Sequence, residues 1–479
     1  MKFTVLSHAG LLVEHQGTRI VSDPWLAGSC YWRSWWNYPE PPAELVDSLQ
    51  TDYIYLTHLH WDHFHGPSLR RLLAHNPAVR VLVPKVPTRR MLDDLAYLGF
   101  RDVREIPHGK SVRLGADFTL HSYQFGPAVD SAMVLSGGGR TLFNANDCKH
   151  FGLPLRQITR RFPRFDFVFR SHSSASPIPY CVDGHQETLP GLRSQRDYIE
   201  EFTRFALHVR ARYAVPFASN HCFLHRDTYG FNSTAVSPVE VRSHYTQLSR
   251  SSGSESQCMV MTPGSSWSEE AGFDIRPFDY SQRAAHLEAL RDKHGATLAA
   301  QYDREAQTLV DADSADRYFT DFTRALPRAL RLLLRDCLTF RVTDAARVQC
   351  WVLDLARGKV RRTDVPHASG PVIDIPALVF NDCVGNRMFS VWSASKRLRI
   401  RLRSLADLAI ANRMFALLDF YELDMLPLRR NFSPRALGVR ARRWRDAVEA
   451  LALLFKHRLL GKPFDVAALY ELPAANEGR

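Results

Sequence analysis

The segment "THLHWDHFH", directly after the apolar run "YIYL", places four histidines and an aspartate within eight positions. A tight turn after a strand lets His58 and His60 converge on one cation, while Asp62 and His63 face a second cation nearby. Holding so many polar side chains at the end of a buried strand would be costly without a metal. The spacing H-x-H-x-D-H therefore predicts a site for two divalent metal ions, with His65 as a supporting or solvent-exposed residue.

Length and composition are those of a globular protein. The chain has 479 residues, of which 45% are hydrophobic and 23% charged, which suffices for two or three domains with their own cores. No apolar run reaches the roughly 18 residues that a membrane helix needs. We therefore expect a cytoplasmic protein without a transmembrane segment. The eight cysteines are spread singly along the chain, which is typical of reduced thiols.

The formal charge of +12 favours acidic partners, which include anionic substrates, acidic proteins and nucleic acids. Much of the positive charge lies late in the chain, in "KRLRIRLRS" (396–404) and in residues 430–462. We expect this region to recruit an anionic small molecule or a substrate bound to an acidic carrier. No RNA-binding motif accompanies the charge.

Residues 1–265 alternate short strand-like runs with turns and helical stretches, several of the runs being apolar throughout. Apolar runs of this kind indicate sheets covered on both faces, so the pattern predicts a two-sheet sandwich flanked by helices. The first two runs flank "EHQGTR" as in a β-hairpin. Apolar residues near helical spacing predict a helix over 192–213 that leads into a strand.

The serine-rich segment 249–258 marks the approach to a boundary, and we place the domain edge near residue 275. This gives a domain over 1–275 and a C-terminal α+β domain over 276–479. The second domain begins with helical patterns over 281–310 and 316–337, the latter interrupted at Pro327.

Three strand-like segments and a helix follow in the C-terminal domain. The segments "VQCWVLDLARGKVRRTD", "GPVIDIPALVFNDCVG" and "RMFSVWSASKRLRIRLRS" read as strands. In the last one, four arginines alternate with apolar residues and predict one basic face: Arg397, Arg399, Arg401 and Arg403. A long amphipathic helix with a basic side is expected around 438–460. The order of strands is similar to that of sterol-carrier-type lipid-binding domains.

The H-x-H-x-D-H segment resembles the signature of the metallo-β-lactamase fold, an αβ/βα sandwich with a two-metal site at one edge of its sheets. The resemblance implies an aspartate that bridges the metals at the end of a later strand, and "RTLFNANDC" supplies Asp147. It also implies a carboxylate that hydrogen-bonds a ligand histidine, for which Asp23 is the candidate. Turn chemistry alone would equally account for Asp23 before Pro24.

Five blocks between residues 23 and 266 are similar to the CMP-N-acetylneuraminate hydroxylase branch of that fold. They are "DPWLAGSCYWRSWWNYPEPP", "YIYLTHLHWDHFHGPSLRRL", "VDSAMVLSGGGRTLFNANDC", "YAVPFASNHCFLHRDTY" and "TPGSS". That hydroxylase branch carries a Rieske iron–sulfur domain ahead of this region, whereas here the fold is expected to begin at Met1. Electrons for an oxygenase would then come from a separate protein.

The wider fold commonly places a histidine ligand between the first motif and the bridging aspartate. Here the candidates are His121, inside a strand, and Asp130, at the turn before the strand "SAMVL"; the absence of any protein ligand there is a third alternative. We favour Asp130. A carboxylate in place of an imidazole makes the site harder and more anionic, which suits iron or manganese better than zinc.

The last ligand is expected after a late strand. In the hydroxylase-like pattern it lies nine residues after the proline of "PFA", which selects His225. The resemblance leaves His221 and His172 as residues that support the metal or face the substrate. The aromatic residues Trp35 and Trp36 lie in an irregular stretch beside the expected site, as core packing or as a wall that excludes water from it.

The resemblance implies a dinuclear metalloenzyme, and we expect an oxygen-activating diiron hydroxylase. One iron would be held by His58, His60 and Asp130, and the other by Asp62, His63 and His225, with Asp147 as the bridge; Asp62 and Asp147 are also the expected catalytic residues. The alternative is a di-zinc hydrolase that cleaves a phosphoester, lactone, amide or ester, and manganese is a third choice of metal. A binding protein without chemistry would not need so complete a ligand set.

Overall fold

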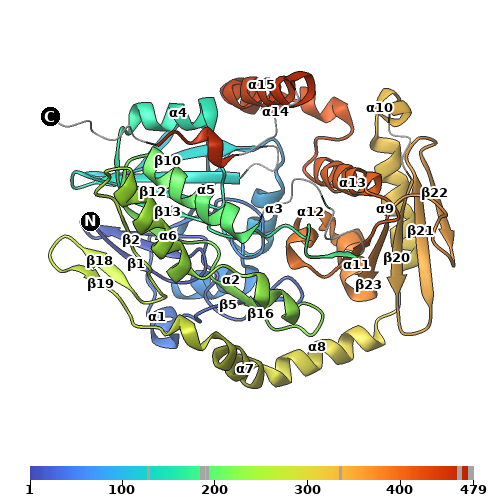
Figure 1. Cartoon of the computed structure of the whole chain (residues 1–479), viewed down its shortest axis with the longest axis horizontal. Coiled ribbons are helices and arrows are strands. Elements are labelled where there is room, and N and C mark those ends of the chain that lie inside the picture. The colour runs from blue at the N-terminus through green and yellow to red at the C-terminus, as the bar shows by residue number, and fades with distance from the viewer. Residues whose placement is uncertain (127–129, 184–188, 190–193, 334–336, 461–465, 473–479) are drawn as a thin grey trace.

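Two large β-sheets pack face to face in the first part of the chain (Figure 1). The computed structural model describes the backbone except at residues 127–129, 184–188, 190–193, 334–336, 461–465 and 473–479, and the side chains except there and at 332–333 and 454–460. The eight-stranded sheet has the order β19-β18-β1-β2-β3-β6-β7-β8. Its strands are β1 (Lys2–Val5), β2 (Leu11–His15), β3 (Thr18–Ser22), β6 (Tyr53–Tyr55), β7 (Arg80–Pro84), β8 (Val103–Ile106), β18 (Ser266–Ser268) and β19 (Gly272–Asp274).

The seven-stranded sheet has the order β17-β15-β13-β12-β11-β10-β9. The layer between the two sheets is apolar and contains Phe3, Leu135 and Phe167, all fully buried. Burial of such side chains between sheets is the main stabilising term of a sandwich. The strands are β9 (Ser111–Gly115), β10 (Phe118–Phe125), β11 (Asp130–Gly137), β12 (Arg140–Asn146), β13 (Phe165–Arg170), β15 (Ala211–Pro216) and β17 (Gln257–Cys258).

Helices cover the outer face of each sheet, which confirms the predicted sandwich. α2 (Gly66–His75) and α3 (Arg90–Tyr97) bury Leu69 and Leu95 against the first sheet. The second sheet is covered by α4 (Gly152–Arg161), α5 (Gln195–His208) and α6 (Pro238–Ser251), whose apolar residues join one cluster with the outer face of that sheet.

Local signals explain two of these elements. The predicted hairpin is present: β2 and β3 pair in antiparallel register around Gln16 and Gly17, which both have positive φ, at 47° and 78°, as a two-residue hairpin turn requires. The helix predicted over 192–213 is α5, which begins after Ser194 with a capping box formed with Asp197. Residues 192–193 of that prediction lie outside the described residues.

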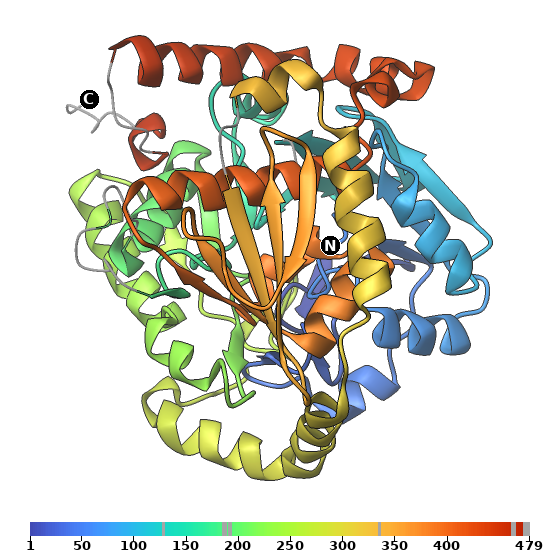
Figure 2. The same ribbon diagram turned by 90° about the vertical axis from the view of Figure 1, so that its right-hand side faces the viewer.

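A third, six-stranded sheet, of order β14-β24-β23-β20-β21-β22, lies at the right in Figure 1 and faces the viewer in Figure 2. Its first strand, β14 (Val182–Asp183), comes from the first part of the chain and pairs with β24 (Arg399–Arg401). The other strands are β20 (Cys337–Thr343), β21 (Val348–Asp354), β22 (Lys359–Thr363) and β23 (Val372–Pro376).

One hydrophobic cluster joins this sheet to the sandwich. It contains Trp25, Tyr31 and Trp35 from the first part of the chain, together with Phe340 and Trp392 from the second. The predicted boundary near 275 falls between β19 and α7 (Arg283–Lys293). α7 and α8 (Gly295–Gln307) run along the lower edge of Figure 1 between the two parts. A small sheet of β4 (Ser29–Cys30), β5 (Trp35–Asn37) and β16 (His221–Phe223) lies beside this contact.

Several late strand predictions were wrong. Residues 377–386 form α11 (Ala377–Asn386) after the strand β23. The segment 387–404 contains α12 (Phe389–Trp392) and a 3-10 turn, and only three of its residues lie in β24. Short apolar runs do not distinguish a buried helix from a buried strand. The helix expected around 438–460 is two helices, α14 (Pro434–Arg442) and α15 (Trp444–Leu460).

The interruption predicted at Pro327 is confirmed, because α9 (Ala312–Ala325) ends just before it and α10 (Arg328–Leu333) starts just after it. α13 (Ala406–Glu422) packs near the third sheet. Within the described residues, every helix is too short or too polar to span a bilayer.

The predicted basic face of 397–403 is real except at its first member. Arg399, Arg401 and Arg403 are exposed, whereas Arg397 is buried. Its guanidinium lies 3.0 Å from Glu305 Oε1 and 3.2 Å from an Asp227 carboxylate oxygen, and it donates to the carbonyl oxygen of Trp32 at 3.1 Å. Arg397 therefore ties α8, the loop after β16 and the aromatic stretch together.

We expect Arg397→Ala to lower the free energy of unfolding by about 3 kcal/mol, because it leaves the Glu305 carboxylate, whose side chain is only 9% exposed, without its cation. The matched control is Arg401→Ala, which removes an exposed ion pair with Asp374 and should cost about 1 kcal/mol or less. Urea unfolding of both variants measures the difference. Equal, small losses would show that Arg397 is not a structural tie.

Candidate metal centre

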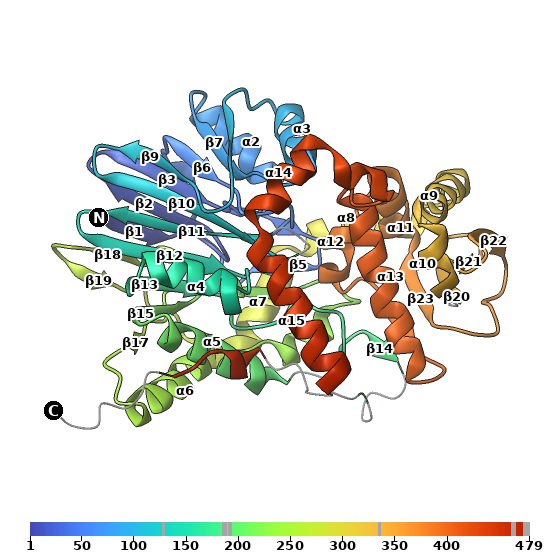
Figure 3. The same ribbon diagram turned by 90° about the horizontal axis from the view of Figure 1, so that it is seen from above.

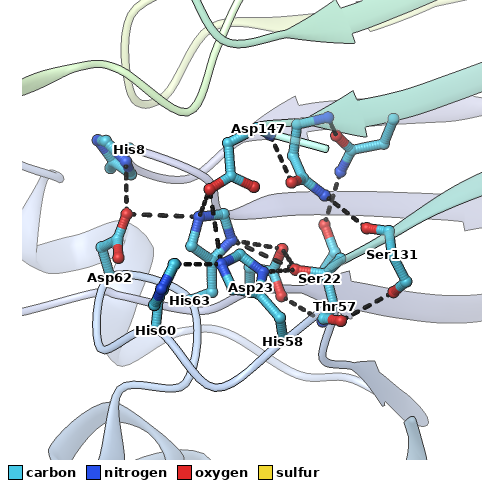
Figure 4. Close-up of polar contacts among 12 residues, drawn as sticks. His8, Ser22, Asp23, Thr57, His58, His60, Asp62, His63, Ser131 and Asp147 are labelled. Atoms are coloured by element: carbon cyan, nitrogen blue, oxygen red, sulfur yellow. Dashed lines mark hydrogen bonds and ion pairs between the residues drawn. The ribbon is translucent and has the colours of Figure 1, made fainter. Parts of the chain in front are cut away.

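The histidine-rich segment forms the loop between β6 and α2, at the end of a buried strand. The strand residue Tyr55 is fully buried, and so is Thr57, the first polar residue after it. The loop closes through the backbone amides of His63 and Phe64, which both donate to the carbonyl oxygen of His60 at 3.0 and 2.7 Å. This turn brings the polar side chains of the loop to one side, where Figure 4 shows them facing Asp147.

His63 is held through one ring nitrogen and presents the other. Its Nδ1 donates to Asp23 Oδ2 at 2.9 Å, and Asp23 also accepts from the backbone amide and hydroxyl of Thr57, at 2.9 and 2.8 Å. The other nitrogen, Nε2, is buried and has no hydrogen-bond partner. Metal-binding histidines show this arrangement, in which a carboxylate orients the ring and fixes its tautomer.

Asp147 lies directly after β12 and faces two of the motif histidines. Its Oδ2 is 3.5 Å from His58 Nε2 and 3.6 Å from His63 Nε2. Its Oδ1 is buried without a hydrogen-bond partner. His58 Nε2 also lies 2.8 Å from His60 Nδ1. His58, His63 and Asp147 thus form a group whose ligand atoms lie within 4.8 Å of one another.

His8 and Tyr31 complete a second group around Asp62. The His8 ring donates from Nε2 to Asp62 Oδ2 at 3.1 Å, and the Tyr31 hydroxyl donates to Oδ1 at 2.5 Å (Figure 4 for His8). His8, Asp62 and His63 have ligand atoms within 4.8 Å of one another, so His63 belongs to both groups. Sequence analysis missed His8, which lies three residues after β1 and belongs to no motif. Tyr31 belongs to the aromatic stretch that was expected beside the site, as core packing or as a wall, but its contact with Asp62 was not predicted.

Asp130 starts β11 and lies within electrostatic reach of this cluster. Burial and, after it, the charge of Asp147 raise the pKa of its carboxyl group to about 6, although His60 and His63 act in the opposite direction. Its Oδ1 is buried without a hydrogen-bond partner. A carboxylate in this position stays unsatisfied unless a cation balances it.

Burial and the nearby carboxylates also shift the pKa values of the motif histidines. Burial lowers the pKa of His58 and of His60, which favours the neutral imidazole that binds metals. Burial opposes the charged form of His63 too, but Asp147, Asp62 and Asp23 outweigh it and raise its pKa well above the usual value. The donor set of imidazoles and carboxylates, with several buried atoms unpaired, fits a pair of divalent cations.

The structure does not bring His225 to this cluster. Its Nε2 lies 3.3 Å from Glu305 Oε2 and its Nδ1 lies 3.7 Å from Asp227 Oδ2, in a separate group that also contains Arg397. The ligand role predicted for His225 stays a prediction that this arrangement does not support. His225 was selected by its distance in sequence from the proline of "PFA". That spacing gives no indication that Glu305 of α8 lies next to His225 in the fold.

His221 and Trp35 lie closer to the cluster. Their rings stack at 3.6 Å between centroids, and the His221 ring lies 5.3 Å from that of His8. His172 is buried with both ring nitrogens unpartnered, and burial followed by the charge of His8 lowers its pKa to about 3. The side chains of these residues therefore line the His8 side of the cluster.

The remaining residues predicted for the site contact side chains outside the metal-ligand cluster. His121 packs against Phe162, at 5.1 Å between ring centroids, and is not grouped with the motif. Trp36 faces His294 of the α7–α8 connection. His65 is buried, not exposed, and its Nδ1 lies 2.7 Å from Ser68 Oγ in the first turn of α2.

One spacing in the sequence matches the ligands of a Rieske cluster. The expectation that this chain has no Rieske domain did not take this spacing into account. Cys-x-His at 148–150 is followed by Cys-x-x-His at 222–225. The two cysteines belong to separate hydrophobic clusters, and His225 faces Glu305. The described residues therefore do not assemble a Rieske site from this spacing.

A cavity of about 960 Å³ opens beside the loop. Tyr31, Trp32 and Trp61 line one side of it, and the Trp61 ring lies 5.8 Å from the Tyr31 ring and 4.7 Å from the Trp32 ring. Met388 and Val391 also line the cavity. The cavity meets the metal-ligand cluster through Tyr31, whose hydroxyl contacts Asp62.

Three comparisons relate this geometry to known proteins. Residues 18–217 match the family described as "Beta-lactamase superfamily domain". A putative Rieske 2Fe-2S iron–sulfur protein of Mycobacterium tuberculosis is 27% identical over 325 residues, which cover 64% of this chain and 61% of the relative. The cytidine monophosphate-N-acetylneuraminic acid hydroxylase of Pan troglodytes is 29% identical over 153 residues, 31% of this chain and 26% of the hydroxylase. The chain thus spans less than two thirds of these relatives.

Solved structures with similarity to the chain include CmlA beta-hydroxylase, as a point mutant, and an isothiocyanate hydrolase from Delia radicum gut bacteria. The first has a TM-score of 0.36 and 17% identity, covering 54% of this chain and 52% of that one. The second has a TM-score of 0.40 and 16% identity, covering 56% of this chain and 99% of that one.

The family match contains the whole H-x-H-x-D-H segment, Asp130 and Asp147, and the two packed sheets with outer helices are the architecture expected from that segment. Residues 18–217 therefore match a β-lactamase superfamily domain, and the sandwich to which they contribute has the metallo-β-lactamase fold.

Proposed function

We propose that this chain is a dinuclear metalloenzyme that activates dioxygen and hydroxylates an anionic or carrier-bound substrate. The observation that carries the proposal is the carboxyl group of Asp130, whose Oδ1 is buried without a hydrogen-bond partner and which lies within electrostatic reach of Asp147, His60 and His63. We propose that it replaces the histidine ligand that the fold commonly has at this point of the sequence. Together with Asp62 and Asp147 it gives the cluster three carboxylates. Oxygen-rich donor sets favour iron or manganese over zinc.

The ligand assignment combines the order of the sequence motif with the two groups of side chains, neither of which contains His60 or Asp130; His60 Nδ1 lies 2.8 Å from His58 Nε2. His58, His60 and Asp130 would hold one ion, Asp62 and His63 the other, and Asp147 would lie between the two ions. For the second ion, His8 is the further histidine available beside Asp62 and His63. This replaces His225 in the ligand set that the sequence predicted.

Bound iron would supply the redox chemistry: reduction of dioxygen with two electrons from a separate donor and two protons, so that one oxygen atom enters a C–H bond and the other leaves as water. The residues of the chain position and shield this reaction. The Tyr31 hydroxyl keeps its proton, because burial and then the charge of Asp62 raise its pKa well above the usual value. Its hydrogen bond orients Asp62 from the cavity side.

The aromatic wall of the cavity would exclude water from the reacting atoms. Tyr31 and Trp61 stack with an interplanar angle of 15°, and Trp32 closes against Trp61. A substrate that enters beside Trp61 would reach the cluster at Tyr31. Exclusion of water protects a reactive oxygen species from side reactions.

The named relatives support the oxidative assignment. One is a hydroxylase, and the mycobacterial relative is named as a putative Rieske iron–sulfur protein, a class of electron carrier. The sequence shared with this chain covers only part of each relative. Because the described residues do not assemble a Rieske site, we propose an electron donor on a separate protein.

A metal-dependent hydrolase is the second candidate. The specific observation in its favour is the set of His58, His60, His63, Asp62 and Asp147, which would suit two zinc ions without any help from Asp130. In that case the substrate would be a phosphoester, lactone, amide or ester.

Metal analysis and anaerobic reconstitution test the two candidates. We expect protein reconstituted with iron under argon to retain about two equivalents of iron and to consume dioxygen when a chemical reductant is added. Protein loaded with zinc should not consume dioxygen. Hydrolysis of generic ester or phosphoester substrates by the zinc form, without dioxygen consumption by the iron form, would establish the hydrolase instead.

The identity of residue 130 should set the choice of metal. We expect Asp130→His to shift the ratio of retained zinc to iron upward by roughly tenfold when both metals compete, because an imidazole replaces a hard carboxylate. Asp117→His, at an exposed carboxylate, is the control and should leave the ratio unchanged. An unchanged ratio in Asp130→His would remove Asp130 from the ligand set.

The carboxylate behind His63 should control affinity. We expect Asp23→Ala to weaken metal binding by roughly 10- to 100-fold, because His63 loses the hydrogen bond that orients its ring. Competition with a chelator measures the affinity, and circular dichroism establishes whether the variant is folded. Asp102→Ala, at an exposed surface pair, is the control. Native affinity in folded Asp23→Ala would contradict the orienting role.

A further inference from the structure

The helices α4, α14 and α15 form one face of the molecule. α14 and α15 lie along the top of Figure 1 with no element above them, and in Figure 3, seen from above, they cross in front of the other elements with α4 beside α15. None of the residues proposed as metal ligands lies on these helices, so this face is separate from the candidate metal centre.

The outward side of α15 is apolar. Trp444, Val448 and Leu451 are 50%, 42% and 66% exposed, and Ala447 is exposed between them. Their spacing of three or four residues places them on one side of the helix, which we call the α15 stripe. Exposed apolar stripes of this kind are uncommon on a soluble surface and mark a site of interaction.

The opposite side of α15 holds the helix on the sandwich. Glu449 accepts a hydrogen bond from the backbone amide of Leu153 in α4, at 2.8 Å, and Leu453 packs on the cluster under α4 and α5. The fold therefore uses the inner side of the helix and leaves the α15 stripe outside. Leu428, Phe432 and Leu437, in the segment that leads into α15, are also exposed.

A pocket rich in arginine lies along the flank of the stripe. It has a volume of about 350 Å³ and is lined by Leu153, Gln157, Arg156, Arg160, Arg161 and Arg445. Arg445 joins the pocket to the stripe, because its guanidinium lies 4.6 Å from the ring centroid of Trp444 while NH1 donates to Gln157 Oε1 at 3.4 Å.

The positive charge of this pocket is not neutralised within the described part of the chain. There, none of its four arginines forms an ion pair with a carboxylate, and no acidic residue lines the pocket. Asp446, the acidic residue next to Arg445, is paired with Arg443 at 2.6 Å, and Glu449 is engaged by α4. An external anion is the partner that this pocket lacks.

We propose that this face docks on the surface of an anionic phospholipid membrane, with lipid phosphates in the arginine pocket and the α15 stripe among the acyl chains just below them. A free anion would need the arginines but not a row of exposed apolar side chains beside them. A helix that lies in a membrane interface has both features, an apolar side and flanking arginines, with an aromatic residue at the boundary. The net charge of +12 adds a long-range attraction.

Vesicle flotation with the full chain tests this proposal. We expect the protein to float with vesicles of phosphatidylcholine and 30% phosphatidylglycerol, to stay unbound with phosphatidylcholine alone, and to be released by roughly 0.5 M salt. The double variant Arg156→Gln with Arg160→Gln should weaken binding by roughly tenfold or more, since each Lys or Arg near the membrane surface contributes about fivefold. The double variant Trp444→Ser with Leu451→Ser should also weaken binding by roughly tenfold or more, because it removes the side chains that would lie among the acyl chains.

The control variants remove the same kinds of side chain, exposed arginines and an exposed leucine, at places away from this face. Arg347→Gln with Arg361→Gln removes two exposed arginines, one in the turn between β20 and β21 and one in β22, and Leu309→Ser removes an apolar side chain of 60% exposure. Both variants should bind as the wild type does. Circular dichroism and gel filtration accompany every variant.

Three results would overturn the proposal. The first is no flotation with anionic vesicles, and the second is binding that the controls weaken as much as the variants of this face do. The third is a change from dimer to monomer in the stripe variant, which would make the face a contact between two copies. Metal loading is not required in any arm, so a failure here leaves the proposed oxygenase untouched.

Discussion

The hydrogen bond between Asp23 and His63 organises the metal centre. Both side chains are fully buried; Asp23 directly follows β3, and His63 lies in the loop after the neighbouring parallel strand β6. Asp23 also holds Thr57, the residue at which the loop leaves β6. Three bonds to one carboxylate therefore fix where the loop starts and which nitrogen of His63 faces the cluster. The cost of burying that carboxylate is offset only when all three bonds are present.

The sandwich, its hairpin and the loop of ligands could be predicted, because each rests on short-range patterns: apolar strands, a two-residue turn, and four ligand residues at fixed spacing. Asp147 follows its strand as the family pattern implies. Residues brought by long-range packing could not be predicted. Glu305 contacts His225, and Arg397 contacts Glu305; both come from the second half of the chain. No local sequence pattern predicts these contacts.

His8 and Arg397 illustrate two different failures of sequence reasoning. His8 follows the first strand as one polar residue among apolar ones, and nothing local separates a metal-site histidine from a histidine of the core. Arg397 alternates correctly with its neighbours, but it lies before β24 begins and its side chain turns inward. Alternation predicts a face only where the strand exists.

The aromatic stretch beside the metal centre belongs to a hydrophobic cluster whose larger share comes from residues beyond 310. Trp32 donates its indole proton to Asp382 of α11, and Ser34 donates to the carbonyl oxygen of Ser395. The wall of the cavity is thus held in place by α11 and by the segment before β24, which contribute none of the proposed ligands. Substitutions in the later half of the chain would therefore alter the shape of the cavity and leave the histidine-rich loop unchanged, so the two parts can evolve separately.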